Sequence, residues 1–192
     1  MNNNNIKKLV INIDMINGFL KKGALASPSI MRIVPIQKEI LDEALESSDT
    51  GIVFVRDSHS KNATEFKNYP VHCIKNSKES ELIDELKKYE KYANTYLKNS
   101  TNLIYAPNIM NDLKSLKNLE EVRLMGCLSE VCVKNGAIAL KTYFDEINKD
   151  ADVLVYADAI DTFDAPNHES NKVTLNALKE MENSGVKVLK RK

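Results

Sequence analysis

Six short segments, most of them rich in Val, Ile and Leu, constrain the fold of this chain more than any other feature. They lie at 9–13, 51–55, 94–98, 122–126, 152–157 and 186–189. Segments with apolar residues at helical spacing separate most of them, at 29–47, 79–88, 107–117, 131–146 and 166–183. Strands that alternate with helices form parallel sheets whose two faces are covered by the helices. We therefore predict an α/β fold with a six-stranded, mostly parallel sheet and helices on both faces.

Length and charge narrow the class of protein further. The chain has 192 residues and no obvious linker, so we expect one domain over 1–192, with residues 1–6 as a frayed tail. Lys plus Arg and Asp plus Glu both number 27, which gives no net charge for binding nucleic acid. No apolar run approaches the roughly 20 residues of a membrane helix, and no signal peptide is evident. We expect a cytoplasmic protein that binds neither nucleic acid nor membrane.

Side chains that can carry out chemistry follow the first four predicted strands. Asp14 follows the first strand, Asp57 and His59 the second, and Lys98 the third, while Cys132 comes shortly after the fourth. The carboxyl ends of parallel strands meet at one edge of the sheet, where open α/β proteins bind their ligands. Each side chain alone could be an ordinary cap, surface charge or core residue. Their convergence at one edge favours an active site.

Cys132 is the candidate nucleophile. It is one of three cysteines, and an odd number without a secretory signal argues against a disulfide framework. Cys132 opens a predicted helix, where the helix dipole and free N–H groups lower the pKa of a thiol. A neighbouring lysine would lower that pKa further. The alternative is that Cys132 is a small buried apolar residue.

The segment DSHSKNATEFKNYPVHC (57–73) has the composition of a metal site. It lies in the longest non-periodic stretch of the chain and contains two of the three histidines. Asp57 and His59 are two residues apart, so both can turn towards one ion, and His72 follows in a Tyr-Pro-Val-His turn. Imidazole with carboxylate suits Zn²⁺, Fe²⁺ or Mn²⁺, and Glu65 is a further candidate ligand. Alternatively, the histidines cap loops through hydrogen bonds.

These motifs resemble the isochorismatase-like hydrolase superfamily and, within it, the nicotinamidases. Four blocks occur in family order over residues 8–185: INIDMINGF with Asp14 and Phe19, DSH with YPVHC, LKNSTN with Lys98, and GCLSEVCV with Cys132. DAPNHES (164–170), which enters the last predicted helix, is similar to the family as well. The Asp/His/His set favours nicotinamidases over relatives that lack it.

The sequence also departs from the family pattern in three places. Ile74-Lys75-Asn76-Ser77 replaces a frequent Gln-Gly-Thr, Tyr69 stands where Trp is common, and Ser129-Glu130 replaces the commoner Thr-Asp. These departures concern ring stacking and loop shape rather than the reacting groups.

The resemblance implies a cysteine amidohydrolase that converts nicotinamide to nicotinate and ammonia, in salvage towards NAD. We expect Asp14 to take the proton of Cys132 and Lys98 to stabilise the thiolate, so that a thioester can form. The backbone N–H groups of Leu128 and Cys132 would form the oxyanion hole, with a cis peptide at Cys127–Leu128.

The resemblance also implies one divalent metal ion, with zinc as the first choice and iron or manganese as alternatives. Asp57, His59 and His72 would hold the ion, which would bind the pyridine nitrogen of the substrate. Phe19 and Tyr69 are candidates to sandwich the substrate ring, and Tyr105 is a weaker one; ordinary core packing is the alternative for each. The expected partner is a small-molecule amide. Because the family often self-associates, a homo-oligomer stays open.

Three other functions compete with this interpretation. The same machinery could hydrolyse another cyclic or heteroaromatic amide. The set of metal ligands and the intact Cys132 argue against an isochorismatase-type vinyl-ether hydrolase. A catalytically inactive binding protein would be expected to lack Asp14, Lys98 or Cys132, and all three are present.

Overall fold

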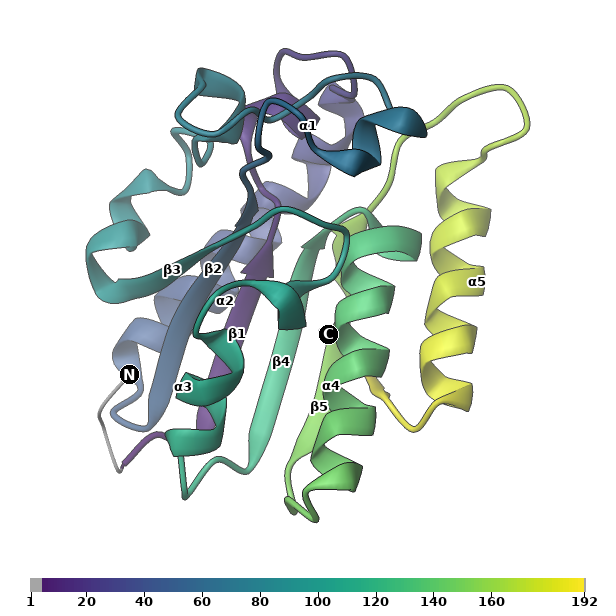
Figure 1. Ribbon diagram of the computed structural model, residues 1–192. Helices are drawn as coiled ribbons and strands as arrows, with labels where there is room; N and C mark the ends of the chain where they lie inside the picture. Colours follow the sequence, from purple (N-terminus) through teal and green to yellow (C-terminus); the bar gives the residue numbers. More distant parts are fainter. Residues whose placement is uncertain (1–4, 192) are drawn as a thin grey trace.

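The computed structural model describes residues 5–191, and its centre is a six-stranded sheet in the order β3-β2-β1-β4-β5-β6 (Figure 1). Neighbouring strands pair in parallel throughout. The strands are β1 (Lys8–Ile13), β2 (Thr50–Asp57), β3 (Ala93–Lys98), β4 (Glu121–Cys127), β5 (Asp152–Asp161) and β6 (Lys187–Leu189). The predicted α/β class and parallel sheet are confirmed.

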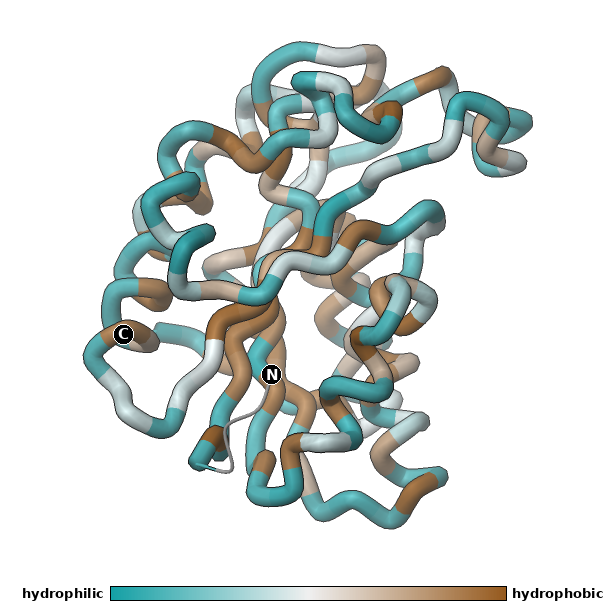
Figure 2. Tube along the Cα trace, turned by 60° about the vertical axis from the view of Figure 1, so that its left-hand side comes forward, coloured by the Kyte–Doolittle hydropathy of each residue, from teal (hydrophilic) through white to brown (hydrophobic). Residues whose placement is uncertain are grey.

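Helices cover both faces of the sheet, as predicted. On one face lie α1 (Asn17–Leu20), the 3₁₀ helix η1 (Pro28–Ile33) and α2 (Val34–Glu46). On the other face lie α3 (Ile109–Ser115), α4 (Lys134–Glu146) and α5 (Ser170–Asn183) (Figure 1). The apolar residues accordingly divide into one cluster on each face of the sheet, and Figure 2 shows the hydrophobic residues gathered along the central strands. No helix within residues 5–191 is long and apolar enough to cross a membrane.

The helix predicted at 79–88 is wrong. The chain forms the 3₁₀ helices η3 (Lys78–Ser80) and η4 (Lys87–Tyr92), with an irregular segment between them. In that segment Leu82 pairs with Ile16 in an isolated bridge, and Leu82, Ile83 and Leu86 are buried. The apolar residues that suggested a helical face are therefore buried by an irregular segment that packs against the start of α1. Tertiary packing, rather than local periodicity, determines the structure of this segment.

Two predicted helices begin differently in the structure. The helix predicted from Pro166 begins at Ser170, because residues 165–168 form a turn and the Ser170 N–H donates to Asp164 Oδ1. The helix predicted from residue 131 is preceded by η6 (Ser129–Val133), a short π-helix that carries Cys132. Within the tail predicted at 1–6, residues 1–4 lie outside the described part of the chain, and Ile6 is partly buried against the core.

The strand order reverses between β1 and β4, and this switch point positions the candidate site. The chain moves outwards from β1 through β2 to β3 on one side, and from β4 through β5 to β6 on the other. Crossovers therefore diverge above the carboxyl ends of β1 and β4, which leaves room for a ligand there. Asp14 directly follows β1, and Cys127 ends β4.

Gly126 allows β4 to approach β1 closely at this switch point. Its φ is +129°, a region that residues with a side chain rarely adopt. A Cβ added at Gly126 would lie 2.0 Å from the carbonyl oxygen of Ile13 and 2.7 Å from its nitrogen. Both obstacles are backbone atoms of the neighbouring strand, so no side-chain rotation can relieve the overlap.

We predict that Gly126→Ala lowers the free energy of unfolding by about 3 kcal/mol or more, because both the backbone conformation and the strand spacing must change. Urea denaturation followed by circular dichroism measures this. Gly51→Ala is the matched control in β2, since its added Cβ would meet only the ends of the Leu9 and Ile6 side chains. A Gly126→Ala variant as stable as Gly51→Ala would contradict the close approach.

Candidate active site

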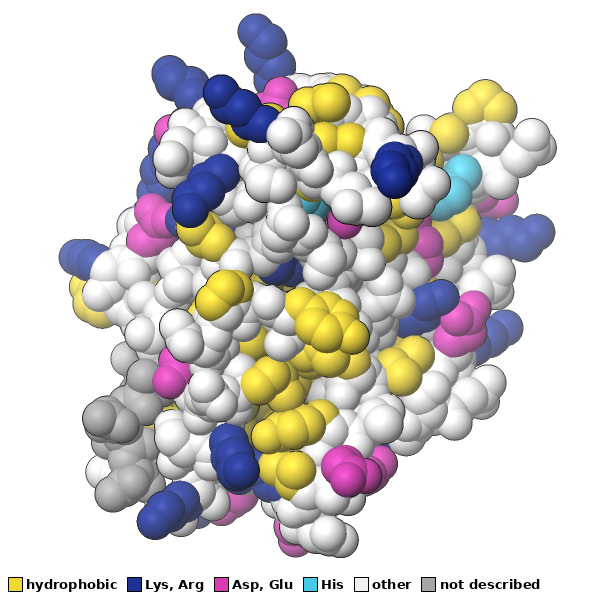
Figure 3. Space-filling model, viewed as in Figure 1, with side chains coloured by type: hydrophobic (Ala, Val, Ile, Leu, Met, Phe, Trp, Pro, Cys, Tyr) yellow, Lys and Arg dark blue, Asp and Glu magenta, His cyan; other side chains and the backbone are white. Residues whose placement is uncertain are grey.

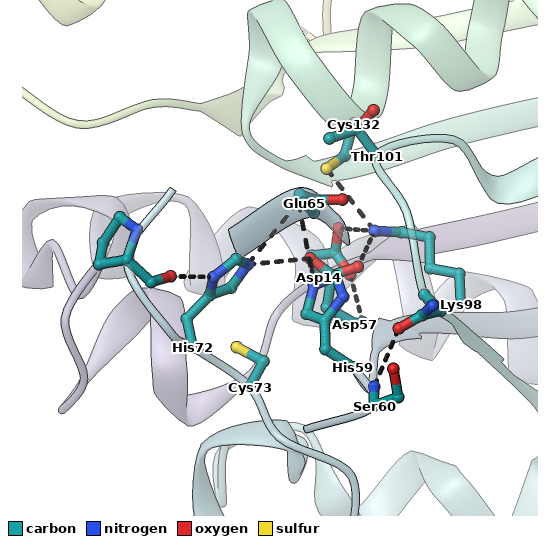
Figure 4. A network of polar contacts seen from close by, with 12 residues as sticks. Asp14, Asp57, His59, Ser60, Glu65, His72, Cys73, Lys98, Thr101 and Cys132 are labelled. Carbon is teal, nitrogen blue, oxygen red and sulfur yellow. Dashed lines mark hydrogen bonds and ion pairs between the residues drawn. The ribbon is translucent and has the colours of Figure 1, made fainter. Parts of the chain in front are cut away.

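The side chains of Asp14, Lys98 and Cys132 meet at the carboxyl edge of the sheet (Figure 4). Lys98 Nζ lies 2.8 Å from Asp14 Oδ2 and donates to Cys132 Sγ at 3.6 Å. A carboxylate oxygen of Asp14 and the Sγ atom of Cys132 lie within 4.8 Å of each other. All three side chains are buried. The structure thus brings together the three residues predicted to be catalytic.

Asp14 is held in a constrained position by the ends of three strands. Its φ is +56°, in the left-handed region, which aspartate tolerates better than most residues. Its N–H donates to Val55 O at 2.9 Å, and its carbonyl oxygen accepts from the Cys127 thiol at 3.2 Å. Its Oδ1 accepts from the Asp57 N–H at 2.8 Å. Backbone contacts therefore orient the carboxylate towards Lys98.

The charges of the site shift its pKa values in a consistent pattern. Burial and the charge of Asp57 raise the pKa of Asp14 to about 6, against the opposing effect of Lys98. Burial lowers the pKa of Lys98, but Asp14 and Asp57 outweigh that effect and raise the pKa well above its ordinary value. Asp14 is thus mostly ionised at neutral pH, close to the pH at which a carboxylate can both accept and return a proton.

Cys132 does not have the lowered pKa that its place in the sequence suggested. Burial raises the pKa of its thiol well above the ordinary value; Lys98 lowers it, and the charges of Asp14 and Asp57 raise it again. The expectation of a lowered pKa is therefore wrong for this buried resting site. Because the thiol keeps its proton, a nucleophilic Cys132 needs a base, and the neighbouring carboxylate of Asp14 can serve as one.

Asp57, His59 and His72 bring three donor atoms together beside Asp14 and Lys98 (Figure 4). His59 Nε2 lies 3.4 Å from Asp57 Oδ2, and His72 Nε2 lies 4.0 Å from the same oxygen. Glu65 Oε1 lies 4.0 Å from His59 Nε2 and 3.9 Å from His72 Nε2. The structure therefore brings together all four predicted ligands, including Glu65.

This donor set fits a divalent metal ion. Ligand atoms of a tetrahedral zinc site with bonds of about 2.0–2.1 Å lie about 3.4 Å apart, close to the separations found here. His72 Nδ1 lies 2.8 Å from Pro70 O, a contact that fixes its tautomer and leaves Nε2 free to bind an ion. Both ring nitrogens of His59 are buried without a well-aligned hydrogen bond from the described residues. A metal ion would satisfy such a nitrogen.

Asp57 connects the two halves of the site. Its Oδ1 accepts from Lys98 Nζ, while its Oδ2 faces His59 and His72. Burial raises the pKa of Asp57, but Lys98 and His59 outweigh that effect, so the net pKa is lowered. The carboxylate is ionised at neutral pH, as a metal ligand must be.

The predicted aromatic residues lie in different places. Phe19 is buried with its ring centroid 5.7 Å from that of His72, and Tyr69 is 41% exposed at 6.4 Å. Tyr105 is 72% exposed at the end of η5 (Leu103–Tyr105), where it lines a cavity of about 560 Å³ along β3 together with Lys98. On the face in Figure 3, hydrophobic side chains gather near the middle of the view, between α3 and α4.

Phe66 is a residue of this site that the sequence interpretation missed. Its ring centroid lies 5.4 Å from that of His59 and 5.5 Å from that of His72, in edge-on arrangements. Phe66 therefore packs against both candidate ligands. Its position directly after Glu65 in the candidate metal segment was the available signal.

The two residues predicted to form the oxyanion hole lie on the segment that joins β4 to α4. The peptide bond between Cys127 and Leu128 is cis, as the resemblance implied. The carbonyl oxygen of Leu128 accepts from the N–H groups of Val131 and Val133, which begins the turn that carries Cys132. Leu128 and Cys132 thus lie on one turn of the chain, and Cys132 Sγ lies near the carboxylate of Asp14.

Comparisons with known proteins identify the family of the chain and support its fold. The model of the isochorismatase domain family matches residues 8–192. A nicotinamidase from Bacillus subtilis has a similar structure, with 24% identity, a TM-score of 0.77, and coverage of 95% of this chain and 99% of that chain.

Two further structures are similar at 23% identity and a TM-score of 0.77. A pyrazinamidase of Pyrococcus horikoshii in complex with zinc is matched over 96% of this chain and 99% of that chain. An N-carbamoylsarcosine amidase from Thermoplasma acidophilum is matched over 96% of both chains. At these identities the likeness shows the fold. No curated protein sequence matches at a significant level.

We predict that Lys98→Met lowers the free energy of unfolding at pH 7 by about 3–5 kcal/mol, because it leaves the carboxylates of Asp14 and Asp57 buried without their cation. Urea denaturation measures this. Lys75→Met, at an exposed lysine, is the control and should change stability by less than about 0.5 kcal/mol. Equal stability of the two variants would show that Lys98 does not neutralise the buried carboxylates.

Proposed function

Because this chain belongs to the isochorismatase domain family of hydrolases, we propose that it is a cysteine amidohydrolase that converts nicotinamide to nicotinate and ammonia. The observation that carries the proposal is the position of Lys98 Nζ, 2.8 Å from Asp14 Oδ2 and 3.6 Å from Cys132 Sγ. This cluster of nucleophile, base and cation lies directly beside the four candidate metal ligands. The product nicotinate would enter salvage towards NAD.

The first half of the reaction forms a thioester. Asp14 takes the proton of the Cys132 thiol as the sulfur attacks the carboxamide carbon and the carbonyl π electrons move onto oxygen. The N–H groups of Leu128 and Cys132 donate to this oxyanion. When the carbonyl reforms, the C–N bond breaks and Asp14 gives its proton to the leaving nitrogen, which departs as ammonia.

The second half of the reaction returns the enzyme to its resting state. Asp14, ionised again, takes a proton from water as the water oxygen attacks the thioester carbon. The C–S bond then breaks, the carboxylic acid leaves, and Asp14 gives the proton taken from water to the Cys132 sulfur. Lys98 remains charged throughout, because Asp14 and Asp57 hold its pKa far above neutrality. Its charge favours both the ionised Asp14 and the transient thiolate.

The metal centre would position the substrate. Asp57, His59, His72 and Glu65 would hold the ion, and zinc suits these imidazole and carboxylate donors. When bound, the ion supplies a Lewis acid for the pyridine nitrogen, so that the carboxamide is directed towards Cys132. Phe19 and Tyr69 lie around His72 as candidate walls for the substrate ring. The zinc complex of the Pyrococcus horikoshii pyrazinamidase supports this choice of metal.

One observation favours a second candidate substrate, another cyclic or heteroaromatic amide on the same machinery. The side chain of Tyr69 is 41% exposed, so it encloses one side of the proposed ring site incompletely. A ring site that is open on one side discriminates only weakly against substrates with larger ring substituents, because apolar contacts contribute little to substrate discrimination. An inactive binding function is less well supported, since Asp14, Lys98 and Cys132 are all present and in contact.

We predict that the purified protein releases ammonia from nicotinamide and that Cys132→Ala lowers kcat about a thousandfold or more, because no nucleophile remains. A coupled ammonia assay measures the rate, with Lys117→Met, at an exposed lysine outside the cavity beside Lys98, as a control that should retain full activity. Circular dichroism checks that Cys132→Ala is folded. If the zinc-loaded protein does not hydrolyse nicotinamide but hydrolyses another heteroaromatic amide, the proposed substrate is wrong and the proposed reaction class is supported.

We predict that the protein binds one zinc ion. His59→Ala and His72→Ala should each weaken this binding by more than the roughly 10–100-fold that is typical when a residue that only hydrogen-bonds a metal ligand is removed. Competition with a chromophoric chelator measures the affinity. His168→Ala is the matched control, because His168 is the only other histidine in the chain. Chelation should raise KM for nicotinamide more than it lowers kcat. Undiminished affinity in His59→Ala and His72→Ala would place the metal elsewhere.

A further inference from the structure

The segment between β5 and α5, residues 162–169, has no part in the proposed mechanism, yet it lies against the element that carries the nucleophile. Its DAPNHES sequence resembles the family, but the resemblance assigns no role to it. Glu130 Oε1, on η6, accepts from Thr162 Oγ1 at 2.9 Å and lies 3.2 Å from His168 Nε2. Glu130 is only two residues from Cys132, so this loop is attached to the nucleophile segment at both of its ends.

The loop holds His168 in a fixed orientation. The backbones of Ala165 and His168 exchange hydrogen bonds of 3.0 and 2.9 Å around Asn167, whose φ is +66°. The rings of Phe163 and His168 are parallel, with centroids 4.0 Å apart. His168 Nδ1 lies 2.9 Å from Phe163 O. The imidazole is therefore held by stacking on one face and by a hydrogen bond at Nδ1, and its Nε2 is directed at Glu130.

Both ring nitrogens of His168 face oxygen atoms: Nδ1 faces Phe163 O and Nε2 faces Glu130 Oε1. A hydrogen bond to a carboxylate is stronger and more directional than one between neutral groups. The side chains of His168 and Glu130 are partly buried, which reduces screening by solvent.

The segment that bears Cys132 depends on such anchors. η6 is a single π-helical turn of five residues, closed by a hydrogen bond from the Lys134 N–H to Ser129 O. The turn continues directly into α4 at Lys134, which fixes its C-terminal end and leaves its N-terminal residues to be held by other contacts. Its side-chain anchors are Glu130 and Ser129, whose hydroxyl lies 2.8 Å from Thr174 Oγ1 on α5. A shift of this turn would move Cys132 Sγ relative to Lys98 and Asp14.

We infer that His168 is a positioning residue, which acts through Glu130 to hold the turn that presents Cys132 to Asp14 and Lys98. This inference rests on the proposed function, since it takes Cys132 as the nucleophile. It assigns a role to the DAPNHES loop that involves no contact with substrate or metal. Loss of the His168–Glu130 contact should thus affect the reactivity of Cys132 more than the binding of substrate or zinc.

Two variants and a control test this role. His168→Phe keeps a ring to stack on Phe163 but removes both nitrogens, and Glu130→Gln keeps an amide oxygen to accept from Thr162. Glu169→Gln removes the exposed carboxylate next to His168 and controls for a change in loop charge. The first readout is the rate of alkylation of Cys132 by iodoacetamide, followed by peptide mass spectrometry to separate it from Cys73 and Cys127. This readout needs no substrate.

We predict that His168→Phe and Glu130→Gln each slow alkylation of Cys132 and lower kcat about tenfold, with KM and zinc affinity within about twofold of wild type. The double variant should be no slower than the slower single variant, because both changes act on the same His168–Glu130 contact. Glu169→Gln should react like wild type. Thermal unfolding, recorded in parallel, shows that the variants are folded at the assay temperature.

The outcomes separate this inference from the proposed function. Unchanged or faster alkylation in both variants, or additive losses in the double variant, would overturn the positioning role. A rise in KM or a loss of zinc without a change in alkylation would overturn it as well. If wild-type Cys132 itself failed to react, the proposed function would fall and the inference with it; a reactive wild type with unaffected variants overturns the inference alone.

Discussion

The ammonium group of Lys98, placed between the buried carboxylates of Asp14 and Asp57, is the interaction on which the rest of the site depends. Two carboxylates cannot be buried side by side as anions without a cation, because burial and mutual repulsion both oppose ionisation. Lys98 supplies that cation from the end of β3. The ion pairs also couple two chemistries, since Asp14 faces Cys132 and Asp57 faces the histidines. The Lys98 side chain thereby affects the charge state of both the residues around Cys132 and the candidate metal ligands.

The sheet brings these charges together because its strands are parallel and its order reverses between β1 and β4. Asp57 and Lys98 are register partners at the ends of β2 and β3, and Ile13 and Gly126 are partners near the ends of β1 and β4. Residues that are 40 or more positions apart in the sequence are thus fixed within bonding distance by backbone pairing. The side chains need little local structure of their own to reach one another.

The segments that complete the site are irregular, in contrast to the sheet. Asp14 and Cys73 have positive φ angles, and Cys132 lies in a π-helical turn. Such conformations are uncommon for residues with side chains and persist only where the surroundings hold them. Here the surroundings are the strand ends, the Glu79 carboxylate that accepts from the Cys73 N–H, and the contacts of Glu130. A regular scaffold therefore supports a site made of constrained loops.

Local pattern was enough to predict the six strands and most of the helices, because apolar periodicity reflects which face of each element is buried. It failed at 79–88, where Leu82, Ile83 and Leu86 are buried by an irregular chain. It was also enough to select Asp14, Lys98, Cys132 and the candidate ligands, since residue type and position at strand ends require no knowledge of distances.

The sequence by itself determined the fold class and the chemical groups at the carboxyl edge of the sheet. Only the tertiary structure decided how those groups affect one another. Burial, which no local pattern reports, raises the pKa of the Cys132 thiol against the expectation from its helix position. Side-chain direction placed Phe66 against the histidines and Tyr105 on an exposed cavity. Electrostatic and packing energies depend on distance and solvent exposure, and the chain acquires both only when it folds.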